Sequence, residues 1–208
     1  MNKKLILISG SPCVGKTAVG TRLFESYNNS AYLDGDWCWC VHPFSVTDSR
    51  LRNGDRSMSF VLSNYLDSDF EYVFFTSVAL TDPKIRESIL SGITAKDYET
   101  IAFTLTCSEE TLKKRHDRRG DKGETNYFWL HLPPCPGDIV IDTDNKGIRE
   151  VVREMKLLNI MLEVVADNKA AIALYHKMGF SDVGIHRNYW YANNAYSDAI
   201  VMQKCLDD

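Results

Sequence analysis

The sequence lacks any long apolar run and has no excess of positive charge. No segment approaches the roughly 18 consecutive apolar residues that a membrane-spanning helix needs. Lysine and arginine total 24 against 28 aspartates and glutamates, which leaves a net charge of −4. Proteins that bind nucleic acid through the phosphate backbone are usually basic. We therefore predict that neither a membrane nor nucleic acid is a partner.

Zinc-binding cysteine patterns and a secretory leader are missing too. The six cysteines form no C-x-x-C pair and no cysteine–histidine tandem, so we expect reduced thiols. Tryptophans and cysteines alternate over residues 37–40, which indicates a strand end rather than a metal site. Residues 1–4 lead directly into the short apolar run at residues 5–8. The longer apolar stretch and the cleavage site of a signal peptide are missing. A cytoplasmic location is expected.

The most informative segment present is residues 10–17, which has the spacing G-x-x-x-x-G-K-T of a phosphate-binding loop. An apolar run at residues 5–8 precedes it, and Val19, Leu23 and Phe24 after it fit one face of a helix. The glycines let the backbone curve around a phosphate, and the helix N-terminus favours negative charge. The loop residues predicted to bind a nucleotide are Gly10, Ser11, Cys13, Val14, Gly15, Lys16 and Thr17.

Two side chains of this loop have specific expected roles. Lys16 can reach the β- and γ-phosphates, which makes it a candidate catalytic residue. Thr17 can place its hydroxyl on Mg²⁺. ATP and Mg²⁺ are therefore the expected cofactors.

Strand-like and helix-like segments alternate up to about residue 157. This alternation predicts an α/β fold, with a parallel five-stranded sheet and helices on both faces. The expected strands are 5–8, 31–36, 72–75, 101–105 and 138–142. The expected helices are 16–27, 58–66, 83–91, 109–119 and 148–157. Residues 41–57 are polar and are expected to form a loop near the site.

Acidic residues follow two of the expected strands. Asp34 and Asp36 end the second strand and Asp142 ends the fifth. Ligands of such sheets bind at the carboxyl ends of the strands, where the phosphate-binding loop also lies. A carboxylate beside an acceptor hydroxyl can take its proton. We assign Asp36 to the acceptor and Asp34 to the Mg²⁺ site, although the two roles are interchangeable at this stage.

Residues 1 to about 150 resemble the nucleoside-monophosphate-kinase-like superfamily of P-loop kinases, above all shikimate, gluconate and adenylylsulfate kinases. The resemblance rests on the loop at 10–17, the Leu33-Asp34-Gly35-Asp36 turn and the basic segment 113–119. It implies that the basic segment is a mobile lid whose arginines clamp ATP and neutralise the transferring phosphoryl group. Arg115 and Arg119 are then catalytic candidates, Arg118 binds the nucleotide, and Asp142 lines the adenine side.

The resemblance implies ATP-dependent phosphoryl transfer to a hydroxyl or phosphate of a small molecule. Trp37, Trp39 and His42 stand where acceptor-binding residues are expected, either as an aromatic pocket for a ring or sugar or as core. One alternative is a nucleotide-binding or hydrolysing protein without a dedicated acceptor. Another is an acetyl-CoA-binding protein whose P-loop is vestigial.

Residues 158–208 have a different pattern, which predicts a small α+β segment. A strand at 160–164 precedes a helix that begins at Asn168, and a hairpin of strands 183–191 and 197–204 follows. The segment resembles the C-terminal half of the GNAT acetyltransferase superfamily, in which the residue matching Tyr175 often serves as general acid and that matching Asn168 lies near acetyl-CoA. The superfamily's pyrophosphate loop is incomplete here, since only Gly147 is present.

We therefore expect two domains, 1–157 with the P-loop and 158–208 as a truncated acetyltransferase half. Such a half leaves a strand edge and an apolar face uncovered. It is predicted to have a structural role and to form a homodimer.

Overall fold

The computed structural model describes residues 3–45, 48–120, 123–155, 159–192 and 195–205. The chain divides into two compact units, Met1–Met155 and Lys156–Asp208. The boundary predicted at 157/158 falls in residues 156–158, outside the described part of the chain. Among the helices of the described residues, none is both long and apolar enough to cross a membrane.

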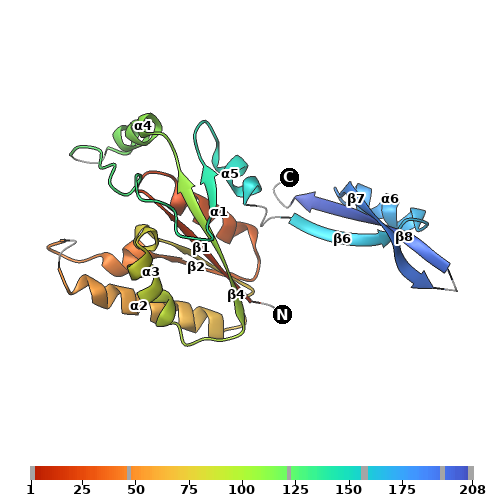
Figure 1. The fold of residues 1–208 in the computed structure, drawn as a ribbon, viewed down its shortest axis with the longest axis horizontal. Coiled ribbons are helices and arrows are strands. Elements are labelled where there is room, and N and C mark those ends of the chain that lie inside the picture. The colour runs from red at the N-terminus through yellow and green to blue at the C-terminus, as the bar shows by residue number, and fades with distance from the viewer. Residues whose placement is uncertain (1–2, 46–47, 121–122, 156–158, 193–194, 206–208) are drawn as a thin grey trace. The chain divides into compact units, whose positions relative to one another are not determined.

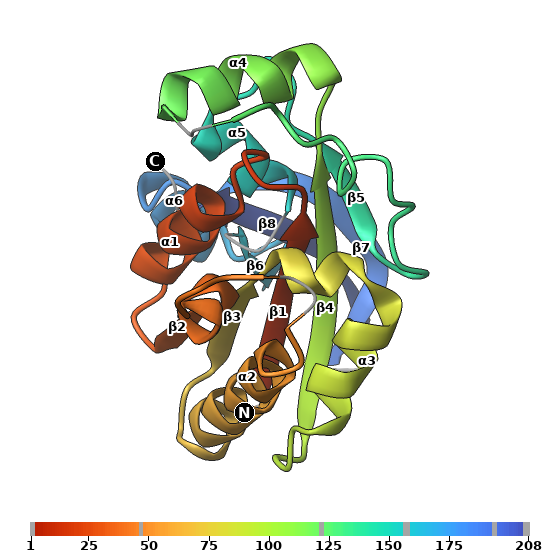
Figure 2. The ribbon, with the colours of Figure 1, turned by 90° about the vertical axis from the view of Figure 1, so that its left-hand side faces the viewer.

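The first unit is built on a parallel sheet of five strands, as predicted (Figure 1). The strand order is β2-β3-β1-β4-β5 (Figure 2). The central strand β1 is buried on both faces from Leu5 to Gly10, which is typical of parallel sheets. Because all five strands run in one direction, their carboxyl ends meet at one edge. The strands are β1 (Lys3–Gly10), β2 (Ser30–Asp34), β3 (Tyr72–Thr76), β4 (Tyr98–Thr106) and β5 (Ile139–Asp142).

Helices cover both faces of this sheet (Figure 2). Side chains alternate along a strand, so Leu5 and Leu7 pack in the cluster beneath α2 and α3. Ile6 and Ile8 point to the other face, where α1 packs beside α5. The helices are α1 (Lys16–Ser26), α2 (Leu51–Asp67), α3 (Pro83–Ser91), α4 (Glu109–Arg119) and α5 (Ile148–Glu154), with short 3₁₀ turns η1 (Gly35–Trp39) and η2 (Val78–Thr81).

The prediction of a loop over residues 41–57 is wrong in its second half, because α2 begins at Leu51. The early turns of α2 contain Gly54, which lowers helix propensity. The structure shows why a glycine is present: an added Cβ would lie 2.7 Å from the carbonyl oxygen of Cys38. Close packing against η1 therefore explains a residue that resembles a loop signal.

The expectation of a strand end at residues 37–40 is also wrong, since residues 35–39 form the 3₁₀ turn η1. Asp34 caps this turn, with its Oδ1 accepting the N–H of Asp36 at 3.1 Å. Trp39 is buried, and its Nε1 donates to Asp55 Oδ1 at 3.2 Å. Of the two interpretations of Trp39, the structure therefore supports a core residue.

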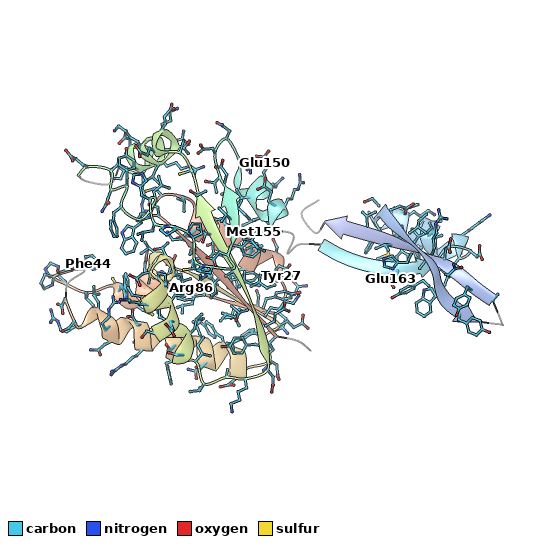
Figure 3. All side chains as sticks on the ribbon, in the orientation of Figure 1. Tyr27, Phe44, Arg86, Glu150, Met155 and Glu163 are labelled. Atoms are coloured by element: carbon cyan, nitrogen blue, oxygen red, sulfur yellow. The ribbon has the colours of Figure 1, made fainter. Side chains whose placement is uncertain are left out.

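A buried ion pair joins α3 to the segment before β5. Arg86 Nη1 lies 2.8 Å from Asp138 Oδ1, and the two side chains are 10% and 2% exposed. The other carboxylate oxygen accepts the hydroxyl of Thr104 at 2.6 Å. Figure 3 marks Arg86 among the packed side chains of this unit. The pair holds the segment that follows the expected lid against β4.

Replacing Arg86 with alanine should destabilise the protein by about 3–5 kcal/mol, because the Asp138 carboxylate would remain buried without its partner. Urea unfolding measures this loss. The matched control is Arg50→Ala, which removes an ion pair whose arginine is 71% exposed and should leave the unfolding midpoint unchanged. Equal losses in both variants would show that burial of the pair is not the cause.

The second unit is a three-stranded antiparallel sheet in the order β6-β8-β7, with one helix, and it confirms the predicted small α+β segment. Val164, Phe180 and Met202 form its core, against which Ile172 and Tyr175 of the helix pack. The elements are β6 (Asn159–Val165), α6 (Lys169–Lys177), β7 (Ser181–Ala192) and β8 (Ala195–Cys205).

Candidate active site

The loop between β1 and α1 has a backbone that few side chains tolerate. Gly10 and Gly15 have φ values of 135° and 106°, and Cys13 lies at φ 66°. A Cβ at Gly10 would lie 2.3 Å from the carbonyl oxygen of Leu105. Only glycine fits this position, since both the φ angle and the close approach exclude a side chain. The loop is thus folded tightly before α1 begins.

A cavity of about 410 Å³ opens beside this loop. It brings together residues from the loop, from η1, from η2 and from α4, which follows the carboxyl end of β4 (Figure 2). Its lining residues are Pro12, Cys13, Gly15, Lys16, Thr17, Ala18, Asp36, Val78, Arg115, Arg118 and Arg119. Three cationic side chains of α4 therefore face the loop and one acidic side chain.

Lys16 is buried, and its Nζ donates to the carbonyl oxygen of Ser11 at 2.9 Å. Burial lowers the pKa of Lys16 to about 8, while the charges of Asp36 and Asp34 oppose this shift. The ammonium group is therefore mainly protonated at pH 7 and loses its proton as pH rises through about 8. A bound polyphosphate would stabilise the charged form.

This pKa predicts how nucleotide binding depends on pH. Phosphate oxygens bind the protonated lysine, and the free protein loses this proton as pH rises through about 8. Below that pH the affinity for ATP should be constant, and above it the Kd should rise about ten-fold per pH unit. Calorimetric titration with Mg²⁺–ATP between pH 6.5 and 9.5 measures the effect. Lys16→Arg, which stays charged throughout, should flatten the profile.

Asp34 lies at the centre of a small oxygen-rich cluster. The Thr17 hydroxyl donates to Asp34 Oδ2 at 2.8 Å, and the Tyr32 hydroxyl contacts the same oxygen at 3.2 Å. Burial raises the pKa of Tyr32 to about 12, so the phenol stays neutral and donates. A threonine hydroxyl beside a buried carboxylate is the oxygen donor set that suits Mg²⁺. The predicted metal residues Thr17 and Asp34 are thus in direct contact.

Asp36 lines the cavity next to this cluster. Burial raises its pKa, the charge of Asp34 adds to the shift, and the charges of Lys16 and Arg119 oppose it. A carboxylate with a raised pKa is a stronger base for taking a proton from a hydroxyl. These features distinguish Asp36 from Asp34, whose oxygens already accept three hydrogen bonds.

Protein oxygens hold the guanidinium of Arg115 in place. Its Nη1 donates to the carbonyl of Val14 at 3.2 Å and to Thr143 Oγ1 at 2.9 Å. Its Nη2 donates to the carbonyl of Thr143 at 2.8 Å. Arg115 therefore fastens α4 to the phosphate-binding loop, and Arg118 and Arg119 line the cavity as well.

Three further residues predicted to bind the nucleotide, namely Gly10, Ser11 and Asp142, do not line the larger cavity. The Ser11 Oγ is buried without a hydrogen-bond partner among the described residues, as an anion-binding hydroxyl would be. Gly10 and Ser11 border a second cavity of about 100 Å³, which Trp129 also lines. Asp142 lines neither cavity, and its Oδ1 accepts the N–H of Asp144 at 2.9 Å.

Sequence reasoning missed Ala18 and Val78 of the cavity wall and Tyr32 beside Asp34. Val78, which forms an apolar part of the cavity wall, follows β3 without any motif that marks it. Tyr32 contacts the Asp34 carboxylate through its hydroxyl, and its place two residues before an acid at a strand end is a usable signal.

In the second unit, the residues matched to acetyltransferase roles have structural contacts. Asn168 caps α6, with its Oδ1 accepting the N–H of Ala171 at 3.1 Å. Tyr175 packs in the core, its ring 5.7 Å from that of Phe180. Both residues therefore contribute to the fold of this unit.

The architecture of the larger unit is similar to solved structures of small-molecule kinases. A gluconokinase from Sinorhizobium meliloti has a TM-score of 0.55 at 19% identity, covering 73% of this chain and 88% of that chain. The APS kinase of Mycobacterium tuberculosis has a TM-score of 0.54 at 16% identity, covering 74% of this chain and 96% of that chain. At such identities the likeness shows the fold alone, which is that of the P-loop small-molecule kinases.

The C-terminal part has a separate relationship. Residues 141–201 match the family model of an acetyltransferase (GNAT) domain. The [ribosomal protein bS18]-alanine N-acetyltransferase of Salmonella typhimurium is 46% identical over 46 residues, 22% of this chain and 31% of that protein. The chain thus spans about a third of the length of that relative. The matched range begins within β5 and includes α5, which both lie in the first compact unit.

Proposed function

We propose that this protein transfers the γ-phosphoryl group of ATP to a small-molecule acceptor. The observation that carries the proposal is the cavity in which Lys16, Asp36 and the arginines of α4 meet beside the Thr17–Asp34 pair. Phosphoryl transfer depends mainly on positioning and on neutralising the charge of the phosphoryl group. One base and several cations around a single cavity supply both.

The phosphate-binding loop would hold the nucleotide. Its backbone N–H groups and Lys16 would bind the phosphates, and the Ser11 hydroxyl is a further donor that has no partner among the described residues. Thr17 and Asp34 would hold Mg²⁺, which when bound neutralises phosphate charge and orients the transferred group. Arg115 positions α4 by fastening it to the loop.

The acceptor would bind next to Asp36. This carboxylate takes the proton of the acceptor hydroxyl. At the same time the oxygen of the acceptor bonds to the γ-phosphorus, and the bond between that phosphorus and the bridging oxygen of ADP breaks. Arg118 and Arg119 face the same cavity and would neutralise charge on the phosphoryl oxygens. The products are ADP and the phosphorylated acceptor.

Two measurements test the proposal against its alternatives. Mg²⁺–ATP should raise the melting temperature of the protein, and acetyl-CoA should not. An ADP-release screen over sugars, nucleosides, cyclic acids and antibiotics should then find acceptors that accelerate ADP formation beyond hydrolysis by water. A shift with acetyl-CoA and none with ATP would contradict phosphoryl transfer, and ADP release that no acceptor accelerates would favour a hydrolase.

For the C-terminal unit we propose a structural role. The N-terminus of α5, where the pyrophosphate loop of an acetyltransferase would lead into a helix, is already capped, since Glu150 Oε2 accepts the N–H of Gly147 at 2.6 Å (Figure 3). Anions bind helix N-termini through such N–H groups. The capping carboxylate therefore opposes binding of a pyrophosphate there.

We also propose that this unit forms a homodimer. Among the described residues β6 pairs with β8 alone, so one of its edges has no partner strand. Large apolar side chains are exposed on the other two strands, namely Val183, Ile185, Trp190 and Tyr191 on β7, the opposite edge strand, and Tyr196 on β8. Such edges and patches are usually covered by another chain.

Light scattering at micromolar concentration should give the mass of a dimer, and Ile185→Asp should shift the protein towards the monomer. Ile185 is 63% exposed, so the substitution should not disturb the core. Phe60→Asp, at an equally exposed position on α2, is the matched control and should leave the mass unchanged. A monomeric mass for the unmodified protein would contradict the proposal.

A further inference from the structure

We infer that the acceptor is an uncharged alcohol that carries a ring, an inference that rests on the proposed kinase function. The first observation is the absence of cations on the acceptor side of the site. Residues 35–45, 77–82 and 123–138 contain neither lysine nor arginine. The first two segments contribute Asp36 and Val78 to the larger cavity, and the third lines the smaller one beside Ser11.

Three basic groups near these segments have acidic partners. Arg52 Nη1 lies 3.0 Å from Asp55 Oδ2, and its guanidinium lies over the Trp39 ring. Arg86 is paired with Asp138, and His131 Nε2 lies 2.8 Å from Glu109 Oε1. The carboxylates of Asp55 and Asp138 offset the positive charge that Arg52 and Arg86 would present to a ligand.

The remaining cations of the larger cavity are Lys16 and the arginines of α4, which surround the place of the ATP phosphates. A phosphate or carboxylate on the acceptor would instead face the Asp36 carboxylate. Like charges that share a partly buried site repel, and a buried charge without a partner is costly. The charge distribution therefore selects against anionic acceptors.

The same segments offer apolar and aromatic surfaces. Trp37, which directly follows Asp36, is 66% exposed, and its ring meets that of Tyr32 edge-on at 5.9 Å. Trp129 and Leu130 line the smaller cavity, and Val78 lines the larger one. Exposed aromatic side chains bind rings through stacking and burial of apolar area. A ring that bears a hydroxyl would place its apolar face on Val78 or Trp37 and its oxygen near Asp36.

The test compares two probes that differ in one group, 4-nitrophenyl β-D-glucoside and 4-nitrophenyl β-D-glucuronide. The second has a carboxylate in place of a hydroxymethyl group. Binding to the full chain is measured by calorimetry with Mg²⁺ and a non-hydrolysable ATP analogue present. The glucoside should bind at least about ten-fold more tightly, because the glucuronide carboxylate finds no cation. Equal or tighter binding of the glucuronide, or no binding of either probe at millimolar concentration, would overturn the inference.

A variant pair tests the aromatic part. Trp37→Ala should weaken glucoside binding by about ten-fold, through loss of stacking area. Phe60→Ala is the matched control, since Phe60 is 67% exposed but lies on α2, whereas Trp37 directly follows Asp36 in η1. Equal affinities of Trp37→Ala and the unmodified protein would refute a ring-binding role for this residue.

ATP binding, measured on the same samples without a probe, separates this inference from the proposed function. If the protein binds Mg²⁺–ATP and prefers the glucuronide, the acceptor class is wrong and the kinase proposal stands. If Mg²⁺–ATP does not bind, the proposed function fails and the inference fails with it.

Discussion

Replacing Lys16 with alanine should lower ATP-dependent phosphoryl transfer by about 10³-fold or more, the largest effect expected of any single substitution here. Lys16 is the cationic side chain of the phosphate-binding loop itself, and it is held inside the cavity by its bond to the Ser11 carbonyl. A charge in such a water-poor position acts strongly on phosphate oxygens. Steady-state ADP release and calorimetric titration of Mg²⁺–ATP measure the loss.

Misfolding can be separated from loss of function in this variant. The lowered pKa of Lys16 shows that burial disfavours its charged form, so near neutral pH the folded state carries a cost that alanine removes. Between the folded pKa of about 8 and the ordinary lysine pKa of 10.5, the unfolded chain binds more protons, so this cost shrinks as pH rises. Lys16→Ala should therefore keep or raise the melting temperature at pH 7.

The control for Lys16→Ala is Lys84→Ala, which removes an exposed lysine from α3 and should leave ATP turnover unchanged. Near-normal turnover in Lys16→Ala would mean that the nucleotide binds elsewhere. Loss of turnover in both variants would mean that overall charge, rather than the loop, governs ATP binding.

The sheet could be predicted because its signals are local. The apolar run of β1 and the proline and acid at the start of α3 are each sufficient to define an element. The first turns of α2 could not be predicted, because their stability depends on tertiary contacts. Asp55 is buried there and binds Trp39 and Arg52, so a polar residue that resembles a loop signal is part of the core.

The candidate site also has one part that local sequence signals predict and another part that depends on tertiary contacts. Lys16, Thr17, Asp34 and Asp36 lie in two short segments directly after strands, and the parallel sheet necessarily brings such segments together. The position of Arg115 depends instead on a hydrogen bond to Val14, a contact between residues 101 positions apart. A basic helix face predicts solvent-exposed charges equally well, so the sequence alone does not show that Arg115 fastens α4 to the loop between β1 and α1.

Replacing Asp36 with asparagine should lower phosphorylation of the acceptor by about 10²–10⁴-fold, the range that general-base catalysis contributes. Asparagine keeps the size of the side chain but cannot take a proton. Slow hydrolysis of ATP should persist, because the phosphate-binding loop and the Thr17–Asp34 pair remain intact. Parallel assays of ADP release with and without acceptor measure the two rates.

Asp34→Asn is the informative partner of this variant, because the two carboxylates are close in sequence but differ in surroundings. Asp34 accepts hydrogen bonds from Thr17, Tyr32 and the N–H of Asp36, which fits a group that orients a metal ion. Its replacement should raise the Mg²⁺ concentration needed for half-maximal rate and should slow hydrolysis and transfer equally. If Asp34→Asn instead removes transfer alone while Asp36→Asn changes the Mg²⁺ requirement, the two roles are exchanged.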